Sequence, residues 1–433
     1  MFPAVRLNKV IRQVLMTLTI LVACIIGWLY IAPSKPAFLQ KKCPPVLGKS
    51  FTSRQKYGDI ERPVDCSAVF EATPSELEYA STFKWCRRSD AITDKDYLDL
   101  TANCDTFLQH GRYNDYEITK EEKDFPLAFS IIMHENVEQM ERLLRVIYRP
   151  QNVYCVHLDA RASLSLHQAL HGISGCFSNV IIPKRPIKVE WSEFSVLEAE
   201  LICMRELWKQ KYWKYFINLT GREYPLKTNL ELVQILKAYD GANDIDGSPH
   251  KRPIIWTKYV WWNENWRTSR LKSPPPDGFV ISKGSTHIAA TRGFVDYALH
   301  DNRSHDLLEW MHDIRVPDEH FFATLNHNPH LDVPGSYKGD PDLKYFYTRL
   351  KIWQSKEETC TGRWFRFICQ FGVADLWRLP KAKQLFVNKF HQEMDPIAFD
   401  CVEQWYRNKT KTRSKLDIDF YRNLDFVKNH LKG

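Results

Sequence analysis

The 433-residue sequence lacks the motifs that mark several common classes of nucleotide-binding and metal-binding proteins. It has no G-x-G-x-x-G and no G-x-x-x-x-G-K-[ST] string, so it predicts neither a dinucleotide-binding fold of the usual kind nor a phosphate loop. It also has no C-x-x-C pair, so it does not predict a structural zinc site. There is no internal repeat and no low-complexity tract, so a folded domain of ordinary complexity is expected.

A strong charge of one sign is missing as well. The formal net charge is +8, and lysine and arginine are scattered among acidic residues, so the sequence gives little support to a nucleic-acid-binding role. A modest positive excess would suit an anionic substrate such as a nucleotide. A hydrophobic content of 44% is enough for one large domain or two smaller ones with a substantial core.

One long apolar run is present near the N-terminus. Residues 14–32 are uncharged and just long enough to cross a bilayer as a helix, and Arg6, Lys9 and Arg12 precede them with no acidic residue among them. A cleaved signal peptide is the alternative, but the run is longer than a usual signal sequence and no small-x-small cleavage site follows it. We predict a signal anchor, with residues 1–13 in the cytosol and the rest of the chain in the lumen of the secretory pathway.

A luminal location changes the interpretation of the cysteines. Ten of the eleven cysteines follow the apolar run, and an oxidising compartment makes disulfide bonds the default expectation. Cys360 and Cys369 are close enough in the chain to bond to each other. Spacing alone does not pair the other eight.

The remaining chain divides by its hydrophobic pattern. Residues 33–60 are rich in proline and lysine and predict a stem, and residues 61–126 form an N-terminal luminal region with mixed short segments. From residue 127 strands alternate with helices, which predicts an α/β fold with a parallel sheet. The expected strands are 127–134, 152–159, 179–183 and 214–219, and the expected helices are 136–148, 162–173, 195–211 and a helix from 228. Two of these helices have capping-box patterns at their starts, Ser195-x-x-Glu198 and Thr228-x-x-Glu231.

Two polar residues end the first two predicted strands. In an open parallel sheet, ligands bind beyond the carboxyl ends of the strands, where His134 and Asp159 stand. The ordinary alternatives are a loop histidine and a turn-forming aspartate. The D-x-D metal motif of many nucleotide-sugar enzymes is missing at the end of the second strand, where HLDARA offers one carboxylate. No divalent metal is therefore expected, and other groups would have to neutralise a diphosphate.

Two cations among aromatic residues could take that role. Arg366 lies in WFRFIC beside the expected local disulfide, and Lys389 lies in FVNKF. Cation–π packing is the structural alternative for both side chains.

The stretch PDEHFFATL, residues 317–325, holds two adjacent carboxylates, Asp318 and Glu319. Proline followed by acids is typical of a helix start, with the phenylalanines as a core face. The other interpretation is a catalytic base.

Together these stretches resemble the core 2-type β-1,6-N-acetylglucosaminyltransferases of mucin O-glycans, glycosyltransferase family 14. The similar strings run from about Asp65 to Asn408 and include AFSIIMH, MERLLRVIYRPQNVYCVHLDARA, CFSNVIIP, YFINLTGREYPLKTNLELV, PDEHFFATL, CQFGVADL and LFVNKF. The resemblance implies a GT-A-like (Rossmann-like) catalytic domain, here 127–409, ahead of a polar tail, 410–433. It also implies a single-pass type II protein of the Golgi membrane and an inverting reaction that needs no metal and no cofactor.

The same resemblance assigns roles to residues. It makes Glu319 the catalytic base, makes Arg366 and Lys389 the ligands of the donor diphosphate, and puts His134 and Asp159 in the uridine-binding segments. On the acceptor side it points to Lys258 and Trp353. The implied reaction moves GlcNAc from a UDP-sugar in β-1,6 linkage to a Gal-GalNAc-type O-glycan on a glycoprotein.

The family's cysteine pattern implies four disulfides: Cys66–Cys401, Cys104–Cys176, Cys155–Cys203 and Cys360–Cys369. Cys43 and Cys86 are left over, and Cys43, in the predicted stem, is the candidate for an intermolecular bond in a homodimer. The N-x-[ST] strings at Asn302 and Asn408 predict N-glycans, whereas Asn218 ends a predicted core strand and should be inaccessible.

Departures from the family pattern keep the substrates open. Lys258-Tyr259 replaces an Arg-Tyr, Ser355 follows Trp353-Gln where a tyrosine is typical, His287 replaces an aromatic residue, and Thr220 replaces a cysteine of the donor side. One alternative is therefore a related transferase that uses UDP-glucose or UDP-xylose. A non-catalytic luminal glycan-binding protein is the other, with the tryptophans of 256–266 stacking on sugars.

Overall fold

The computed structural model describes residues 41–47, 62–250, 254–263, 266–340, 346–413 and 415–431. The predicted cytoplasmic tail and signal anchor lie outside these residues. Within them, no helix combines the length and the apolar character that a membrane crossing requires. Cys43–Gly433 form one unit, which is the unit described below.

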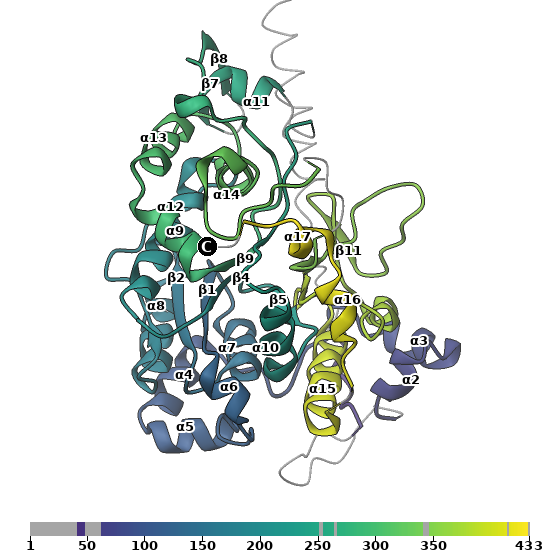
Figure 1. Cartoon of the computed structure of the whole chain (residues 1–433). Coiled ribbons are helices and arrows are strands. Elements are labelled where there is room, and N and C mark those ends of the chain that lie inside the picture. The colour runs from purple at the N-terminus through teal and green to yellow at the C-terminus, as the bar shows by residue number, and fades with distance from the viewer. Residues whose placement is uncertain are drawn as a thin grey trace, which may run out of the picture. The chain divides into compact units, whose positions relative to one another are not determined.

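A six-stranded sheet forms the centre of the fold (Figure 1). Its first four strands are parallel, as predicted, whereas β9 runs antiparallel to β4 and to β6, which the sequence pattern did not predict. Strand β1 is buried at nearly every residue, because helices cover both faces of a parallel sheet. In sheet order the strands are β3 (Val180–Ile181), β2 (Val153–Leu158), β1 (Leu127–Met133), β4 (Tyr215–Thr220), β9 (Ile288–Thr291) and β6 (Asp244–Ile245).

The predicted crossover helices are present. They are α7 (Val137–Ile147), α8 (Leu164–Gly175), α9 (Phe194–Trp208) and α10 (Asn229–Ala238). The capping box at Thr228 and Glu231 is confirmed. The one at Ser195 is wrong: α9 begins at Phe194 after Glu193, and the Ser195 hydroxyl instead accepts a hydrogen bond from the Glu190 amide in the preceding turn.

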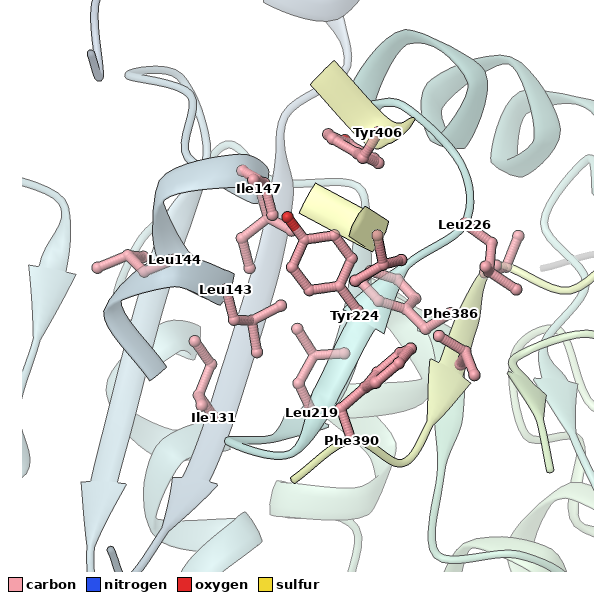
Figure 2. Packing of buried hydrophobic residues seen from close by; sticks show 14 of the residues in the cluster. Ile131, Leu143, Leu144, Ile147, Leu219, Tyr224, Leu226, Phe386, Phe390 and Tyr406 are labelled. Atoms are coloured by element: carbon pink, nitrogen blue, oxygen red, sulfur yellow. The ribbon is translucent and has the colours of Figure 1, made fainter. Parts of the chain in front are cut away.

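A small second sheet packs beside the main one. It consists of β10 (Arg349–Leu350), β13 (Phe386–Asn388) and β5 (Glu223–Pro225), and β5 follows β4 directly in the chain. Figure 2 shows the buried Tyr224 of β5 among side chains of α7, β4 and the β13 region, with Tyr406 of α15 (Pro396–Thr412) above it. This shared core fixes the end of β13, and hence Lys389, relative to the main sheet.

Short helices and ribbons complete the unit. The N-terminal helices are α2 (Cys66–Phe70), α3 (Pro74–Ser81), α4 (Asp94–Thr101), α5 (Cys104–Gly111) and α6 (Lys120–Asp124). The second half adds α12 (Arg292–His300), α13 (Asn302–Met311), α16 (Ile418–Arg422), α17 (Asp425–Lys428) and the ribbon of β11 (Arg363–Phe365) and β12 (Ile368–Gln370).

Five disulfides link the described cysteines, and four of them are the predicted pairs: Cys66–Cys401, Cys104–Cys176, Cys155–Cys203 and Cys360–Cys369. The prediction for Cys43 is wrong. Cys43 bonds to Cys86, so its thiol is not available for an intermolecular disulfide. The Cys43 amide donates to the Arg87 carbonyl, and Val46 pairs with Val64, so this piece of the predicted stem lies against the folded unit.

The three N-glycosylation strings differ in exposure. Asn302 and Asn408 are exposed, whereas Asn218 is buried in β4 and accepts a hydrogen bond from the Ile288 amide. We expect glycans at Asn302 and Asn408 and none at Asn218 in protein from a secretory host. Mass spectrometry of glycopeptides before and after glycan removal checks this, and a glycan at Asn218 would contradict the buried strand.

Candidate active site

The polar residues that follow the strands meet at one edge of the sheet. Met133 pairs with Leu158, and Ile132 pairs with Thr220, so β1, β2 and β4 end side by side. His134 and Asp159 come directly after the ends of β1 and β2, as the parallel-strand rule predicts, and Arg222 follows the end of β4 by two residues.

Asp159 forms an ion pair with Arg161. Both of its carboxylate oxygens accept hydrogen bonds from the Arg161 guanidinium, at 3.0 and 2.9 Å, and one also accepts from the Val189 amide. Burial opposes ionisation of Asp159, but these hydrogen bonds outweigh it and hold the pKa of the carboxyl well below its usual range. Asp159 is therefore a charged group that organises the loop at residues 187–190.

His134 is exposed and contacts a second acidic residue. Its Nε2 lies 3.0 Å from a Glu135 carboxylate oxygen, which also pairs with Arg222. The hydrogen bond from His134 is the main cause that lowers the pKa of Glu135 to about 2, and the charge of Arg222 adds to it. The end of β1 is thereby tied to the end of β4.

Arg366 and Lys389 come together around one aromatic ring. The Lys389 ammonium lies 4.6 Å from the centroid of Phe365, and the Arg366 guanidinium carbon lies 5.7 Å from the same centroid. Arg366 also lies 4.5 Å from the ring of Trp191. The cation–π contacts of the structural alternative are thus present, but they also place two positive charges close together.

More cations surround this pair. Burial lowers the pKa of Lys389 to about 8, and the positive charges of Arg366, Arg222, Lys351 and Arg363 lower it further. We call these five residues the cation cluster. A lysine whose pKa is lowered by neighbouring cations lies in a region of positive potential, and such a region favours a bound anion.

Glu319 lies at the end of a tight turn. The 3₁₀ turn η2 (Pro317–Glu319) precedes α14 (Phe321–Asn326), whose Phe321, Phe322 and Leu325 are buried, as the helix-start interpretation expects. The Glu319 carboxylate is partly exposed and lies 2.6 Å from the Lys283 ammonium. Its carbonyl accepts from the Gly284 amide, which fixes the turn against the segment ahead of β9.

Asp318 differs sharply from its neighbour. It is buried, and burial together with the charge of Glu319 raises its pKa to about 7. Of the two carboxylates, Glu319 is the one that is partly exposed and paired with a lysine, whereas Asp318 is buried.

Lys351 belongs to the cation cluster and also lies near Glu319. Its ammonium donates to the Ser285 hydroxyl at 2.9 Å and lies 5.9 Å from the ring of Trp353. Burial lowers the pKa of Lys351 to about 8, and the nearby charge of Glu319 opposes that shift. The Lys351 ammonium therefore interacts electrostatically with both the Glu319 carboxylate and the other cations of the cluster.

A buried network supports this arrangement, and sequence reasoning missed it. Glu223 lies 2.5 Å from His287 Nε2 and 2.8 Å from Arg349 Nε, and it accepts a hydrogen bond from the side-chain Nδ2 of Asn388 at 2.8 Å. Burial opposes ionisation of Glu223, but Arg349 and His287 outweigh it and lower its pKa to about 2. Burial, helped by the charge of Lys351, lowers the pKa of His287 to about 3, so the imidazole is neutral. Because Asn388 precedes Lys389, the network positions that lysine.

The two predicted acceptor residues belong to different segments of the fold. Trp353 is half-exposed and pairs with Ile368 next to the cation cluster. Lys258 ends α11 (Ile254–Lys258), and Trp256 of that helix lies 5.8 Å from the Lys283 ammonium. No direct contact joins Lys258 to Glu319 in the described residues.

A D-x-D string does stand at this edge, at Asp244 and Asp246, but it is poorly suited to metal binding. Asp244 is buried and accepts hydrogen bonds from the Tyr239 hydroxyl and the Tyr347 amide. Burial raises the pKa of Asp244 to about 7, which disfavours the charged form that a cation needs. Within the described residues, the one cluster of metal-type side chains is Cys360, Cys369 and Asp375, and its cysteines are disulfide-bonded.

A cavity of about 1560 Å³ lies elsewhere, between α5, α10 and α15, and contains none of the predicted site residues. Its charged side chains are largely paired with each other, as in Lys237–Glu121 and Lys409–Glu231. The sheet edge, with its unbalanced cations and accessible carboxylate, is the better site for an anionic substrate.

The chain is similar to known proteins over most of its length. Residues 127–379 match the family model described as Core-2/I-Branching enzyme. The chain is 33% identical to beta-1,3-galactosyl-O-glycosyl-glycoprotein beta-1,6-N-acetylglucosaminyltransferase 3 of Rattus norvegicus over 376 residues, 82% of this chain and 86% of the relative. The human protein of the same name is 33% identical over 367 residues, 81% of this chain and 84% of the relative.

Proposed function

The chain belongs to the Core-2/I-branching enzyme family, and from that premise we propose that its GT-A-like domain transfers GlcNAc from UDP-GlcNAc to a Gal-GalNAc-type O-glycan on glycoproteins, in β-1,6 linkage. It is a glycosyltransferase. The observation that carries the proposal is the accessible Glu319 carboxylate, linked through Lys351 to the cation cluster at the carboxyl edge of the sheet.

The proposed reaction is a single displacement. Glu319 accepts the proton of the acceptor 6-hydroxyl while that oxygen forms a bond to C1 of the donor sugar. The bond between C1 and the diphosphate oxygen breaks, and UDP leaves with the electron pair from the opposite face, so the anomeric centre inverts. A positioned general base of this kind contributes about 10²–10⁴-fold in rate. The ion pair with Lys283 holds the Glu319 carboxylate in position in the free enzyme.

Arg366 and Lys389 would stabilise the charge that develops on the departing diphosphate. Preorganised cations in a partly buried site act strongly on such charge, because water does not screen them fully. His134 and the loop that Asp159 holds would contact the uridine.

We place the enzyme in the Golgi membrane as a single-pass type II protein, with the catalytic domain in the lumen. The apolar run at 14–32 and five disulfides support this location.

A donor screen tests the proposed function. The detergent-solubilised chain is incubated with UDP-GlcNAc, UDP-glucose or UDP-xylose, with and without a Gal-GalNAc acceptor, and released UDP is measured. We expect acceptor-dependent release from UDP-GlcNAc. Release from UDP-glucose or UDP-xylose alone would assign the donor to a related transferase, and no release from any donor would favour the glycan-binding alternative.

We expect the enzyme to keep most of its activity in excess EDTA. The cation cluster supplies positive charge at the diphosphate, and Asp159 and Asp244 are both engaged by protein donors. Initial rates with EDTA, and again after addition of Mn²⁺, measure this. A loss with EDTA that Mn²⁺ restores would contradict the proposal and make Asp246 a ligand candidate.

UDP affinity should weaken as the pH rises above about 8. Lys389 and Lys351 have pKa values lowered to about 8, so they lose their charge in this range, whereas the diphosphate stays anionic. Each lysine that must be protonated for binding weakens the affinity about tenfold per pH unit above its pKa. Calorimetric titration with UDP between about pH 7 and about pH 9.5 measures this, and a Kd that stays constant over that range would contradict the role of the lysines.

A further inference from the structure

A two-stranded ribbon carries an unusual concentration of exposed apolar side chains. Strands β7 (Tyr259–Asn263) and β8 (Trp266–Leu271), with α11 before them, lie at one end of the unit in Figure 1. The exposed fractions are 80% for Trp262, 65% for Trp266, 64% for Ile254, 59% for Leu271 and 44% for Ile255. Large apolar side chains this exposed, and gathered on one ribbon and the helix before it, indicate a surface that contacts something other than water.

Cations accompany these side chains. Lys258, Arg267 and Arg270 are exposed on the same ribbon and helix. The Arg267 guanidinium lies 4.5 Å from the ring of Tyr259. Within the part of the chain that the structure describes, Arg270 lies 3.5 Å from Asp313, an acidic residue that it shares with Lys272. The exposed surface is therefore both apolar and positively charged.

The base of the ribbon is firmly attached. The Trp261 amide donates to the Asp313 carbonyl at 2.8 Å, and the Lys272 amide donates to the Lys258 carbonyl at 3.0 Å. The Arg315 guanidinium lies 5.2 Å from the ring of Trp256 and 5.1 Å from the ring of Trp261. Because the base is fixed, Trp262 and Trp266 are presented outward rather than folded back onto the unit.

The Cys43–Cys86 disulfide limits the distance of the unit from a bilayer. Ala32 is the last residue of the predicted anchor, and Cys43 is bonded into the folded unit. The chain between them spans at most about 40 Å, even fully extended. With the predicted anchor in the membrane, a tether of this length keeps the unit within reach of the bilayer surface, so a bilayer is an available partner for an exposed apolar patch.

We propose that α11 and the β7–β8 ribbon form a membrane-surface contact, with Trp262 and Trp266 at the boundary of headgroups and acyl chains. Tryptophan is enriched at this boundary because its ring is apolar and its N–H is polar. Isoleucine and leucine add buried apolar area, and the neighbouring lysine and arginine side chains attract anionic headgroups. The proposal rests on the membrane anchor proposed at residues 14–32, and it does not depend on which donor or acceptor the enzyme uses.

Photo-crosslinking from the lipid phase tests the contact on the full chain. The chain is reconstituted into phosphatidylcholine vesicles that contain a lipid with a photoreactive acyl chain, and adducts are mapped by mass spectrometry. We expect adducts on peptides of 254–272 in addition to those of the predicted anchor. A second set of vesicles, with added phosphatidylserine, should raise the yield on 254–272.

A matched pair of variants makes the test specific. The double substitution Trp262→Ser and Trp266→Ser should lower the adduct yield on the other residues of 254–272 by on the order of tenfold, because two of its largest apolar groups are gone. Tyr212→Ser, which removes a ring that is 82% exposed elsewhere, should leave the yield unchanged. Adducts confined to residues 1–42, or an unchanged yield in the double variant, would overturn the proposal. So would a double variant that keeps its adducts and instead loses binding to a glycoprotein acceptor.

Discussion

Replacing Glu319 by glutamine should lower kcat by about 10²-fold or more and leave the affinity for UDP nearly unchanged. Glutamine keeps the shape of the side chain and removes the group that accepts the acceptor proton. The cation cluster, which we propose binds the diphosphate, is untouched. Initial rates at saturating donor and calorimetric titration with UDP measure the two quantities on the same preparation.

Asp318→Asn is the matched control, because it makes the same chemical change one residue earlier in a buried position. It should retain most of the rate. The folded-state pKa of Asp318, about 7, lies above its ordinary value, so its contribution to stability is present at low pH and is lost as pH rises towards 7. Asparagine does not ionise, so this loss is absent from the variant. Compared with wild type, the variant should therefore gain stability at neutral pH relative to pH about 4. If both variants turned over at near wild-type rate, PDEHFFATL would be no more than a helix start over a phenylalanine core.

Lys389→Met should weaken UDP binding by about 10²-fold, and should lower kcat/KM at least as much. Methionine preserves much of the length and the apolar contact with Phe365 but removes the charge. If Lys389 serves only cation–π packing, the variant would lose some stability and would bind UDP as the wild type does.

Lys383→Met is a matched control for this change. Lys383 also lies against a phenylalanine ring, at 4.8 Å from the centroid of Phe420, but it pairs with Asp417 and does not belong to the cation cluster. Its substitution should leave UDP affinity within about twofold of wild type. Equal losses in both variants, measured by the same titration, would contradict a specific role for Lys389.

Local pattern was enough to predict the framework of the fold. The apolar runs at 127–134, 152–159 and 214–219 became β1, β2 and β4, and the rule for the ends of parallel strands placed His134 and Asp159 at the correct edge. The antiparallel β9 was missed because its four residues carry no periodic pattern that differs from the surrounding loop.

The features that the sequence did not predict depend mostly on contacts between residues far apart in the chain. Lys351 reaches the site through the small sheet, and Arg349 reaches Glu223 across 126 positions, so no spacing in the sequence indicates either. The same holds for Cys43, whose partner is fixed by the path of residues 43–47 along the unit rather than by spacing. Lys283 was missed because a single lysine before a strand has no distinguishing pattern.

The most direct test of the account is the structure of the product that the wild-type chain makes from UDP-GlcNAc and a Gal-GalNAc acceptor. NMR of the purified trisaccharide reports the anomeric configuration of the new sugar and the carbon to which it is joined. We expect a β-configured GlcNAc on O6 of the acceptor, formed by the wild type and absent with Glu319→Gln. An α-configured product, attachment at another hydroxyl, or an equal yield from the Glu319→Gln variant would contradict single displacement with Glu319 as the base.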